Sequence, residues 1–395
     1  MYNILNIFSM NKNSYDTDNR NNMKNIIGEV SNDKVDMKTT IYNENTAKNL
    51  KININVIQIG KSFLLLLDEK LGSGSFGSVY KGKYIGETTN ELKQGQYVAI
   101  KEIPPLKIDK KGGVSEIAAN MIKSECNIAL SLINKRHPNI VSFYEVIEQN
   151  SKVYIVMELC DSGNFKNFMI ALNKRNEQNR RNNIGAKYDH IKEEFIQFYF
   201  SQLVQGIQFL RENDIMHRDI KLENILLTNQ KSVLKIVDFG LAKQKMSDKD
   251  LTGTICGSPQ CMAPEIIECK KYSSKSDLWS IGIVLFQLVY NFHPLEDCKN
   301  LQQLYKSLKD TNDIQVPPIV SPNNIPINTR ISTNCVNLIG QLLKKKSSDR
   351  ITMKDFFEHE YVLSCHNAYR RKIFENSNIQ TVKTKSSKKT KKRNY

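Results

Sequence analysis

The feature that most constrains this chain is a pair of short polar strings, His217–Asn224 and Asp238–Gly240. The first brings a carboxylate, an ammonium and an amide into one segment, and the second adds another carboxylate. An aspartate in a loop is by itself usually a cap or a solvated charge. Carboxylate and amide oxygens are, however, the ligands that Mg²⁺ prefers, and a nearby ammonium neutralises phosphate charge. The ordered set therefore predicts a site that handles a metal-bound phosphoryl group.

A glycine-rich segment, Gly72–Val79, precedes both strings. Glycines permit a tight turn whose backbone amides can approach phosphates without side-chain obstruction. A Gly-x-Gly-x-x-Gly pattern alone is weak evidence, because dinucleotide-binding folds share it, but there the glycines open a helix. Here Val79 and Tyr80 continue as a strand, and Tyr97–Lys101 provides another strand downstream. The pattern predicts a strand–turn–strand with a lysine nearby.

In this order, the glycine segment, Lys101 and the two polar strings resemble the eukaryotic protein kinases. Lys221, two positions after Asp219, is the pattern of the serine/threonine enzymes. The resemblance spans residues 63–362, about three quarters of the chain. It implies an α+β fold of two lobes, a small β-rich N-terminal lobe and a large helical C-terminal lobe, with ATP in the cleft. It also implies transfer of the γ-phosphoryl group of Mg-ATP to protein serine and threonine hydroxyls.

The resemblance assigns a role to each chemical group. Asp219 accepts or orients the proton of the substrate hydroxyl, and Lys221 neutralises charge on the transferred group. Asn224 and Asp238 bind Mg²⁺ through oxygen, and Lys101 holds the α and β phosphates. A catalytically silent scaffold with this fold usually lacks at least one of these groups, whereas this chain carries all of them.

Lys101 needs a carboxylate on the following helix, and the candidates are Glu116 and Glu125. Glu125 is favoured because apolar residues follow it before His137–Ile140, which matches the family's entry to the next strand. The segment between Glu125 and that tetrapeptide is roughly one helical turn longer than usual. The resemblance then places the ATP contacts at Gly72, Gly74, Gly77, Val79, Ala99, Lys101, Glu125, Glu158, Cys160 and Leu226.

Two threonines between the polar strings and Pro264 are candidate regulatory phosphorylation sites. Thr254 lies where the family carries an activating phosphate, and Thr252 is its nearest competitor. Arg218 is the arginine that commonly ties the catalytic loop to this phosphate. Ser258 is a weaker candidate, because the family uses its hydroxyl to contact the catalytic residues.

The segment Thr254–Glu265 also carries the subfamily signal. Its residues look most like those of the autophagy-initiating serine/threonine kinases, with polo-like and calcium/calmodulin-group enzymes as close competitors. Arg350 matches the arginine that pairs with Glu265 in the family. Cys261 replaces the usual aromatic residue in the pocket for the residue after the phosphoacceptor.

Periodicity predicts two helices of the large lobe and one inserted loop. Residues Leu278–Tyr290 are apolar all round, which is typical of a buried helix, and Asp277 before them is a good N-cap. This run falls short of the roughly 20 residues that a bilayer requires. Residues Glu193–Arg211 have one apolar face. The stretch 173–190, in which residues 173–183 are all polar, is expected to be an inserted surface loop.

The two ends of the chain differ from the middle. Residues 1–62 are rich in Asn and Lys, and we expect them to be a disordered extension. Residues 363–395 are expected to be a basic tail, since Lys and Arg dominate from Thr381 onward. The tail contributes to a net charge of +16 and would suit an acidic partner, nucleic acid or anionic lipid. A solvated tail with no specific partner is the competing interpretation.

The eight cysteines are scattered and form no Cys-x-x-Cys pair. The first residues lack the basic start of a secretory signal. Reduced thiols in a cytoplasmic protein are therefore expected, with the nucleus as an alternative location. The six histidines do not cluster with the cysteines, which argues against a structural zinc site.

Overall fold

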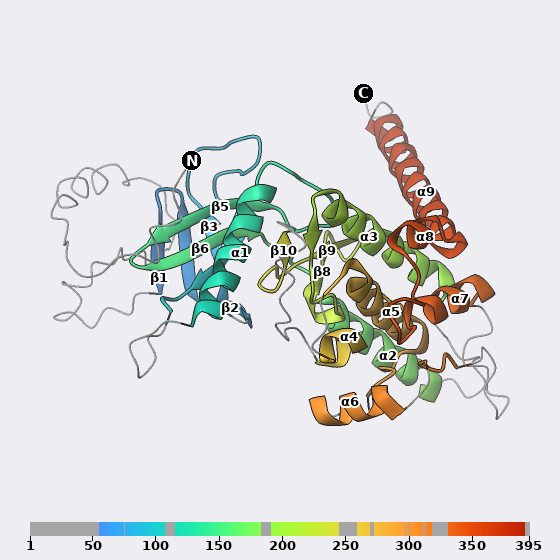
Figure 1. Ribbon diagram of the computed structural model, residues 1–395. Coiled ribbons are helices and arrows are strands. Elements are labelled where there is room, and N and C mark those ends of the chain that lie inside the picture. Colours follow the sequence, from blue (N-terminus) through green and yellow to red (C-terminus); the bar gives the residue numbers. More distant parts are fainter. Residues whose placement is uncertain are drawn as a thin grey trace, which may run out of the picture. The chain divides into compact units, whose positions relative to one another are not determined.

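The computed structural model describes residues 55–74, 76–106, 115–182, 191–244, 259–268, 272–296, 298, 300–310, 313–317 and 331–391. These residues form two compact units. The first is a sheet built mainly from residues before 106, and the second is mostly helical (Figure 1). The expected α+β fold is confirmed.

The first unit is built on a six-stranded sheet with the order β1-β2-β3-β4-β6-β5. Alternating residues of β2, such as Phe63 and Leu65, are buried while their neighbours are partly exposed. This period of two is what half-buried strands require. Residues 147–149 of β5 and 152–154 of β6 belong to this unit. The strands are β1 Val56–Ile59, β2 Phe63–Gly74, β3 Gly77–Tyr84, β4 Tyr97–Ile103, β5 Phe143–Gln149 and β6 Lys152–Glu158.

The first strand corrects the expected boundary of the N-terminal extension. β1 pairs antiparallel with β2, so that Ile59 faces Phe63 and Gln58 faces Leu64. Ile59 is fully buried. The Val-Ile-Gln-Ile sequence of β1 supplies the apolar residues that this pairing needs. Ordered chain therefore begins before residue 63, and residues 1–54 lie outside the described part.

In the second unit, α3, α7 and α8 pack against α5 (Figure 1). Its helices are α1 Glu116–Leu132, α2 Phe165–Asn182, α3 Glu193–Glu212, α4 Pro264–Ile267, α5 Ser274–Tyr290, α6 Leu301–Asp310, α7 Thr333–Leu342, α8 Met353–Glu358 and α9 Glu360–Lys391. Its short strands are β7 Ile215–Met216, β8 Ile225–Thr228, β9 Val233–Ile236 and β10 Lys243–Gln244. The buried helix and the helix after the polar stretch are both where the sequence predicted them.

α3 approaches the β8–β9 hairpin closely at one glycine. A Cβ atom at Gly206 would lie 2.8 Å from Cδ1 of Ile236 and 3.2 Å from the backbone oxygen of Asn139. Ile236 is itself fully buried in β9, so its side chain has little room to move. Gly206 thus sets how near α3 can lie to the strand that leads into Asp238.

The polar stretch 173–190 is not the loop that its composition suggested. Helix α2 runs without a break through Asn182, and only residues 183–190 lie outside the described part. Residues 173–182 contain neither glycine nor proline, and Lys, Arg, Glu and Gln are good helix formers. Because the packed first turns of α2 already supply the nucleus, the helix can extend at little further cost.

The expected tail also begins inside a helix. α9 runs from Glu360 to Lys391, and its first turns bury Tyr361, Val362 and Cys365. α9 packs along α3, where Ser201 Oγ lies 2.8 Å from Nδ1 of His366. The boundary expected at residue 363 therefore cuts through a packed element. Within the described ranges, no helix is both long and apolar enough to cross a membrane.

Candidate active site

Helix α5 anchors the loop that carries Asp219. The Asp277 carboxylate accepts hydrogen bonds from the backbone N–H groups of His217, at 3.2 Å, and Arg218, at 3.0 Å. The Tyr272 hydroxyl donates to the same carboxylate at 2.5 Å. Arg218 adopts a φ of 67°, a left-handed conformation that costs a non-glycine residue free energy. The two hydrogen bonds to Asp277 hold the loop in this conformation.

Asp277 is therefore not the N-cap that its position suggested. Ser273 caps α5, and its hydroxyl accepts from Lys275 N at 3.3 Å. Ser276 completes a capping box by accepting from the backbone N–H of Ser273. Asp277 lies one turn inside the helix, 5% exposed, with its carboxylate turned to the catalytic loop.

His217 links the two polar strings. Its Nε2 lies 2.9 Å from the backbone oxygen of Val237, which can only accept, so Nε2 carries the proton. Nδ1 then accepts from the backbone N–H of Asp219 at 3.3 Å. The His217 ring packs edge-on against Phe239, with ring centroids 5.1 Å apart, and Phe239 packs edge-on against Phe143 at 5.6 Å. The residues before and after Asp238 are thus tied to the loop of Asp219.

The Asp219 carboxylate is the centre of the predicted catalytic set. Its Oδ2 accepts from Lys221 Nζ at 2.6 Å and from Asn224 Nδ2 at 2.8 Å. The same amide also donates to the backbone oxygen of Asp219 at 3.0 Å. Asp219 is 7% exposed, so these contacts are made largely out of water. The structure brings together the three residues that the first polar string predicted.

Asn224 and Asp238 are suited to an oxygen-coordinated cation. Because the amide nitrogen of Asn224 donates to Asp219, its side-chain oxygen is the atom left for a metal. The backbone oxygen of Asn224 accepts from Val237 N at 3.0 Å, which brings the chain next to Asp238 close to it. Asp238 has a φ of 62°, and its Oδ1 accepts from Gly240 N at 3.3 Å. One carboxylate and one amide oxygen match the donor set of Mg²⁺.

The first unit positions the residues expected around phosphate. β2 ends at Gly74 and β3 begins at Gly77, which confirms the strand–turn–strand prediction. A Cβ atom at Gly77 would lie 2.0 Å from the backbone oxygen of Glu102, so only glycine fits there. In the β3–β4 register, Val79 faces Lys101. Lys101 is 3% exposed and Ala99 is also buried.

The two candidate partners of Lys101 differ in burial. Glu125 lies in the middle of α1 and is 3% exposed, whereas Glu116 is exposed in the first turn. α1 begins at the N-cap Ser115, whose hydroxyl accepts from Ala118 N at 3.4 Å. An acidic residue in a first turn is commonly there for the helix dipole. Burial therefore favours Glu125, and its pairing with Lys101 stays a prediction.

The segment of Glu158 and Cys160, which is expected to contact adenine, is held by an ion pair that the sequence alone does not reveal. Lys235 Nζ lies 2.7 Å from Oε2 of Glu158, and Lys235 is itself buried in β9. The backbone N–H of Glu158 donates to Ser142 O at 2.8 Å, which fixes the backbone at this position. The lysine lies three residues before Asp238, and only the β9–β6 arrangement reveals its partner.

Cys160 and Leu226 lie close to this ion pair along the chain. Burial raises the pKa of the Cys160 thiol to about 12, so the thiol is neutral and unreactive at physiological pH. Leu226 lies opposite Lys235 in the β8–β9 hairpin and also bridges to Asn164. Both residues are partly exposed, as residues that contact a ligand should be.

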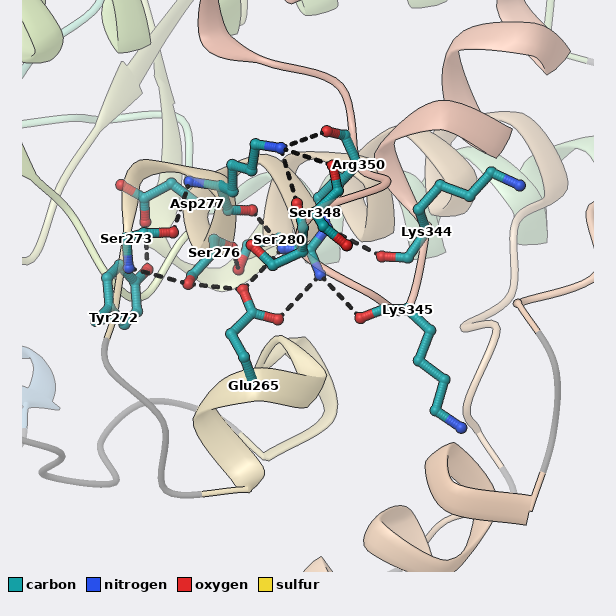
Figure 2. Close-up of polar contacts among 12 residues, drawn as sticks. Glu265, Tyr272, Ser273, Ser276, Asp277, Ser280, Lys344, Lys345, Ser348 and Arg350 are labelled. Carbon is teal, nitrogen blue, oxygen red and sulfur yellow. Dashed lines mark hydrogen bonds and ion pairs between the residues drawn. The ribbon is translucent and has the colours of Figure 1, made fainter.

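The predicted pair between Glu265 and Arg350 is present (Figure 2). Arg350 Nη1 donates to Oε1 of Glu265 at 2.8 Å, and Nη2 donates to Oε2 at 3.0 Å. Burial by itself raises the pKa of Glu265, but the hydrogen bonds and charge of Arg350 outweigh it and lower the pKa. The Ser276 hydroxyl adds a hydrogen bond to Oε1 at 2.8 Å.

Lys275 adds further hydrogen bonds to the same cluster. Its Nζ donates to the backbone oxygens of Ser347, at 2.8 Å, Ser348, at 3.2 Å, and Arg350, at 2.8 Å. In return, Arg350 Nη1 donates to the backbone oxygen of Lys275 at 2.6 Å. The segment that ends in Glu265 is therefore fixed to α5 and to the turn before α8. Thr252, Thr254 and Ser258 lie outside the described residues.

Comparisons with known proteins agree with this geometry. A family model described as protein kinase domain matches residues 65–362. Serine/threonine-protein kinase ATG1b of Arabidopsis thaliana is 33% identical over 296 residues, which cover 74% of this chain and 36% of that protein. Serine/threonine-protein kinase atg1 of Dictyostelium discoideum is 30% identical over 303 residues, 75% of this chain and 39% of its own. Serine/threonine-protein kinase unc-51 of Caenorhabditis elegans is 30% identical over 305 residues, which cover 74% of this chain and 31% of that protein.

The chain thus spans between 31% and 39% of the length of these curated relatives. Their names confirm the resemblance to serine/threonine kinases, and to the subfamily that the residues Thr254–Glu265 suggested.

Proposed function

Because this chain belongs to the protein kinase family, we propose that it transfers the γ-phosphoryl group of Mg-ATP to serine and threonine hydroxyls of proteins. The observation that carries this proposal is the Asp219 carboxylate, which is held at one oxygen by both Lys221 and Asn224. This arrangement fixes a base and a cation side by side where a hydroxyl and a phosphoryl group would meet.

In the proposed mechanism, Asp219 orients the acceptor hydroxyl and receives its proton. Lys221, 2.6 Å from that carboxylate, neutralises the charge of the phosphoryl group in transfer. Asn224 and Asp238 would hold Mg²⁺, which when bound offsets the negative charge of the phosphate oxygens. Lys101 would bind the α and β phosphates, with the carbonyl of Glu158 facing adenine.

The test uses the purified chain, Mg-ATP and a degenerate array of serine, threonine and tyrosine peptides. We expect phosphate on serine and threonine, and Asp219→Asn should lower turnover about a hundredfold or more while ATP binding and melting temperature stay close to wild type. Asp68→Asn, at an exposed position of β2, is the matched control. Near-normal phosphotransfer by Asp219→Asn would exclude the assigned role.

We also propose that phosphorylation of Thr254, with Thr252 as the alternative, activates the enzyme. The support comes from Arg218, the residue before Asp219. Its Nε is buried and has no hydrogen-bond partner among the described residues, while its guanidinium stacks 4.8 Å from the centre of the Tyr272 ring. A phosphate carries about −1.5 to −2 charge and would satisfy that donor. It would then give the loop of Asp219 a second anchor besides Asp277.

The basic residues beyond Thr381 are proposed to bind an anionic partner, whether an acidic protein, nucleic acid or anionic lipid. The support is their charge, since seven of the last fifteen residues are Lys or Arg. Retention on heparin should fall steeply with salt for the full chain. Removal of residues 381–395 should abolish most of that retention, and unchanged retention would contradict the proposal.

A further inference from the structure

A cavity of about 460 Å³ opens beside the catalytic loop in the second unit. Lys221, whose ammonium contacts the Asp219 carboxylate, forms part of its wall. The rest of the wall comes from α2, from residues 259–261, from the end of α5 and from α6. A volume of this size accommodates a drug-sized ligand or a few side chains of an extended peptide. The cavity therefore adjoins the place where a substrate hydroxyl would lie.

Apolar side chains make up about half of the residues in the wall of this cavity, and most of the others are uncharged amides. Met169, Leu222 and Leu304 are buried in it. Ile170 and Phe292 also line it, although they are 43% and 41% exposed. Large apolar side chains left open to water around a concave site are typical of a surface that binds another molecule.

The charged side chains of the wall are all compensated. They are Lys166, Lys221 and Glu223. Lys166 Nζ lies 2.7 Å from Oε1 of Glu223, and Lys221 is paired with Asp219. His293 in the same wall is neutral at physiological pH, because burial lowers its pKa to about 4. The part of the wall that the structure describes thus offers no uncompensated negative charge to an incoming cation.

We propose that this cavity binds an apolar side chain of the protein substrate close to the phosphoacceptor. We further propose that Lys166 sets this preference by occupying Glu223. Glu223 is the one carboxylate among the described residues of the wall, and without Lys166 it would attract a substrate arginine or lysine. The inference rests on the proposed kinase function and concerns which substrates that activity selects.

The ion pair in the wall disfavours a basic side chain of the substrate in this cavity. A substrate arginine entering the cavity would lose water and would have to share Glu223 with an ammonium only 2.7 Å away. An apolar side chain loses no such interaction and covers Ile170 and Phe292. Lys166 and Glu223 have side chains 50% and 43% exposed, so solvent screens the pair. The expected discrimination is therefore moderate, about tenfold in kcat/KM.

The test compares serine peptides that carry Leu or Arg at each position flanking the acceptor. Wild type should prefer Leu at one of these positions by about tenfold in kcat/KM. Lys166→Gln should raise kcat/KM for the arginine peptide about tenfold and change the leucine peptide little. Adding Glu223→Gln to Lys166→Gln should remove the gain. Lys354→Gln, at an exposed position of α8, is the matched control and should leave both values unchanged.

A second variant tests the volume of the same site. Cys261 lines the cavity, and Cys261→Tyr should fill part of it and raise KM for the leucine peptide more than for an alanine peptide. If Lys166→Gln is active and its ratio of kcat/KM for the leucine and arginine peptides equals that of wild type, the inference is overturned. The proposed kinase function would still stand. A wild-type chain that phosphorylates none of the peptides would instead count against the proposed function itself.

Discussion

Glu265 and Arg350 lie 85 residues apart in the sequence and meet in two parallel hydrogen bonds of 2.8 and 3.0 Å. Arg350 is 1% exposed and Glu265 is 7% exposed, so the pair is buried. Removing one partner of such a pair leaves an uncompensated charge out of water, which costs more than the pair itself contributes.

Arg350→Met should therefore destabilise the second unit by about 3–5 kcal/mol. For a unit of this size, the loss corresponds to a fall in melting temperature of roughly 10 °C. Differential scanning calorimetry would measure it, with Arg371→Met at an exposed position of α9 as the control. A shift no larger than that of the control would show that the pair does not stabilise the unit.

Asp277→Asn should impair catalysis more than stability. His217 N and Arg218 N donate to different oxygens of the carboxylate, so the amide would keep one acceptor and present its NH₂ group to the other N–H. The loop would lose its anchor at Arg218, whose φ of 67° needs support. We expect kcat to fall at least tenfold with KM for ATP nearly unchanged. Tyr272→Phe removes only one hydrogen bond to Asp277 and should have a smaller effect. Equal kcat values for all three proteins would contradict this positioning role.

Thr254→Ala should lower activity without much change in melting temperature. A charge-assisted hydrogen bond from Arg218 to a phosphate contributes about 1.5–3 kcal/mol. This free energy would shift a loop equilibrium by about ten- to a hundredfold. Mass spectrometry of active enzyme should find the phosphate, and kinetics would measure the loss. Full activity in the double variant Thr252→Ala, Thr254→Ala would exclude the mechanism.

His293 should make the fold sensitive to mild acid. Its pKa is about 4 in the folded protein, against 6.5 for an exposed histidine. Between these values the unfolded chain binds a proton that the folded chain does not, so stability falls as pH drops from 6.5 towards 4. The loss should reach roughly 2–3 kcal/mol. His293→Asn does not titrate and offers an oxygen in place of Nδ1, which accepts from Leu295 N at 3.0 Å.

Urea unfolding of both proteins at a series of pH values would measure this difference. The gap between the two unfolding free energies should grow in favour of His293→Asn as the pH falls. Parallel curves would show that His293 does not titrate with a lowered pKa.

The arrangement of the proposed catalytic residues was predictable because they are close together in the sequence. Asp219, Lys221 and Asn224 lie within six residues, so one loop is enough to bring their side chains together. The Glu265–Arg350 pair is distant in sequence, and only the family resemblance predicted it. Lys235 and Glu158 carry no such signal, since a buried ion pair cannot be told from two exposed charges without the fold.

Helix ends were the less predictable part, for physical reasons. An aspartate before an apolar run, such as Asp277, can be the N-cap of the helix or a buried acceptor inside its first turn. The sequence pattern is the same in both cases. Which N–H groups face the carboxylate is decided by packing against His217 and Arg218. Similarly, the polar residues up to Asn182 suit a loop or an exposed helix, and their continuity with the packed start of α2 decides between them.

Because α3 lies so close to β9, Gly206 affects the position of Asp238 although it has no side chain of its own. A methyl group at Gly206 would press on Ile236, and Ile236 lies two residues before Asp238. Displacement of the strand would carry the metal ligand with it. A random-mutagenesis screen for lost phosphotransfer should therefore recover Gly206→Ala or Gly206→Ser alongside substitutions of Asp219 and Asp238. Such variants would show how the backbone spacing of a helix, far from any substrate, limits the substitutions that the chain tolerates.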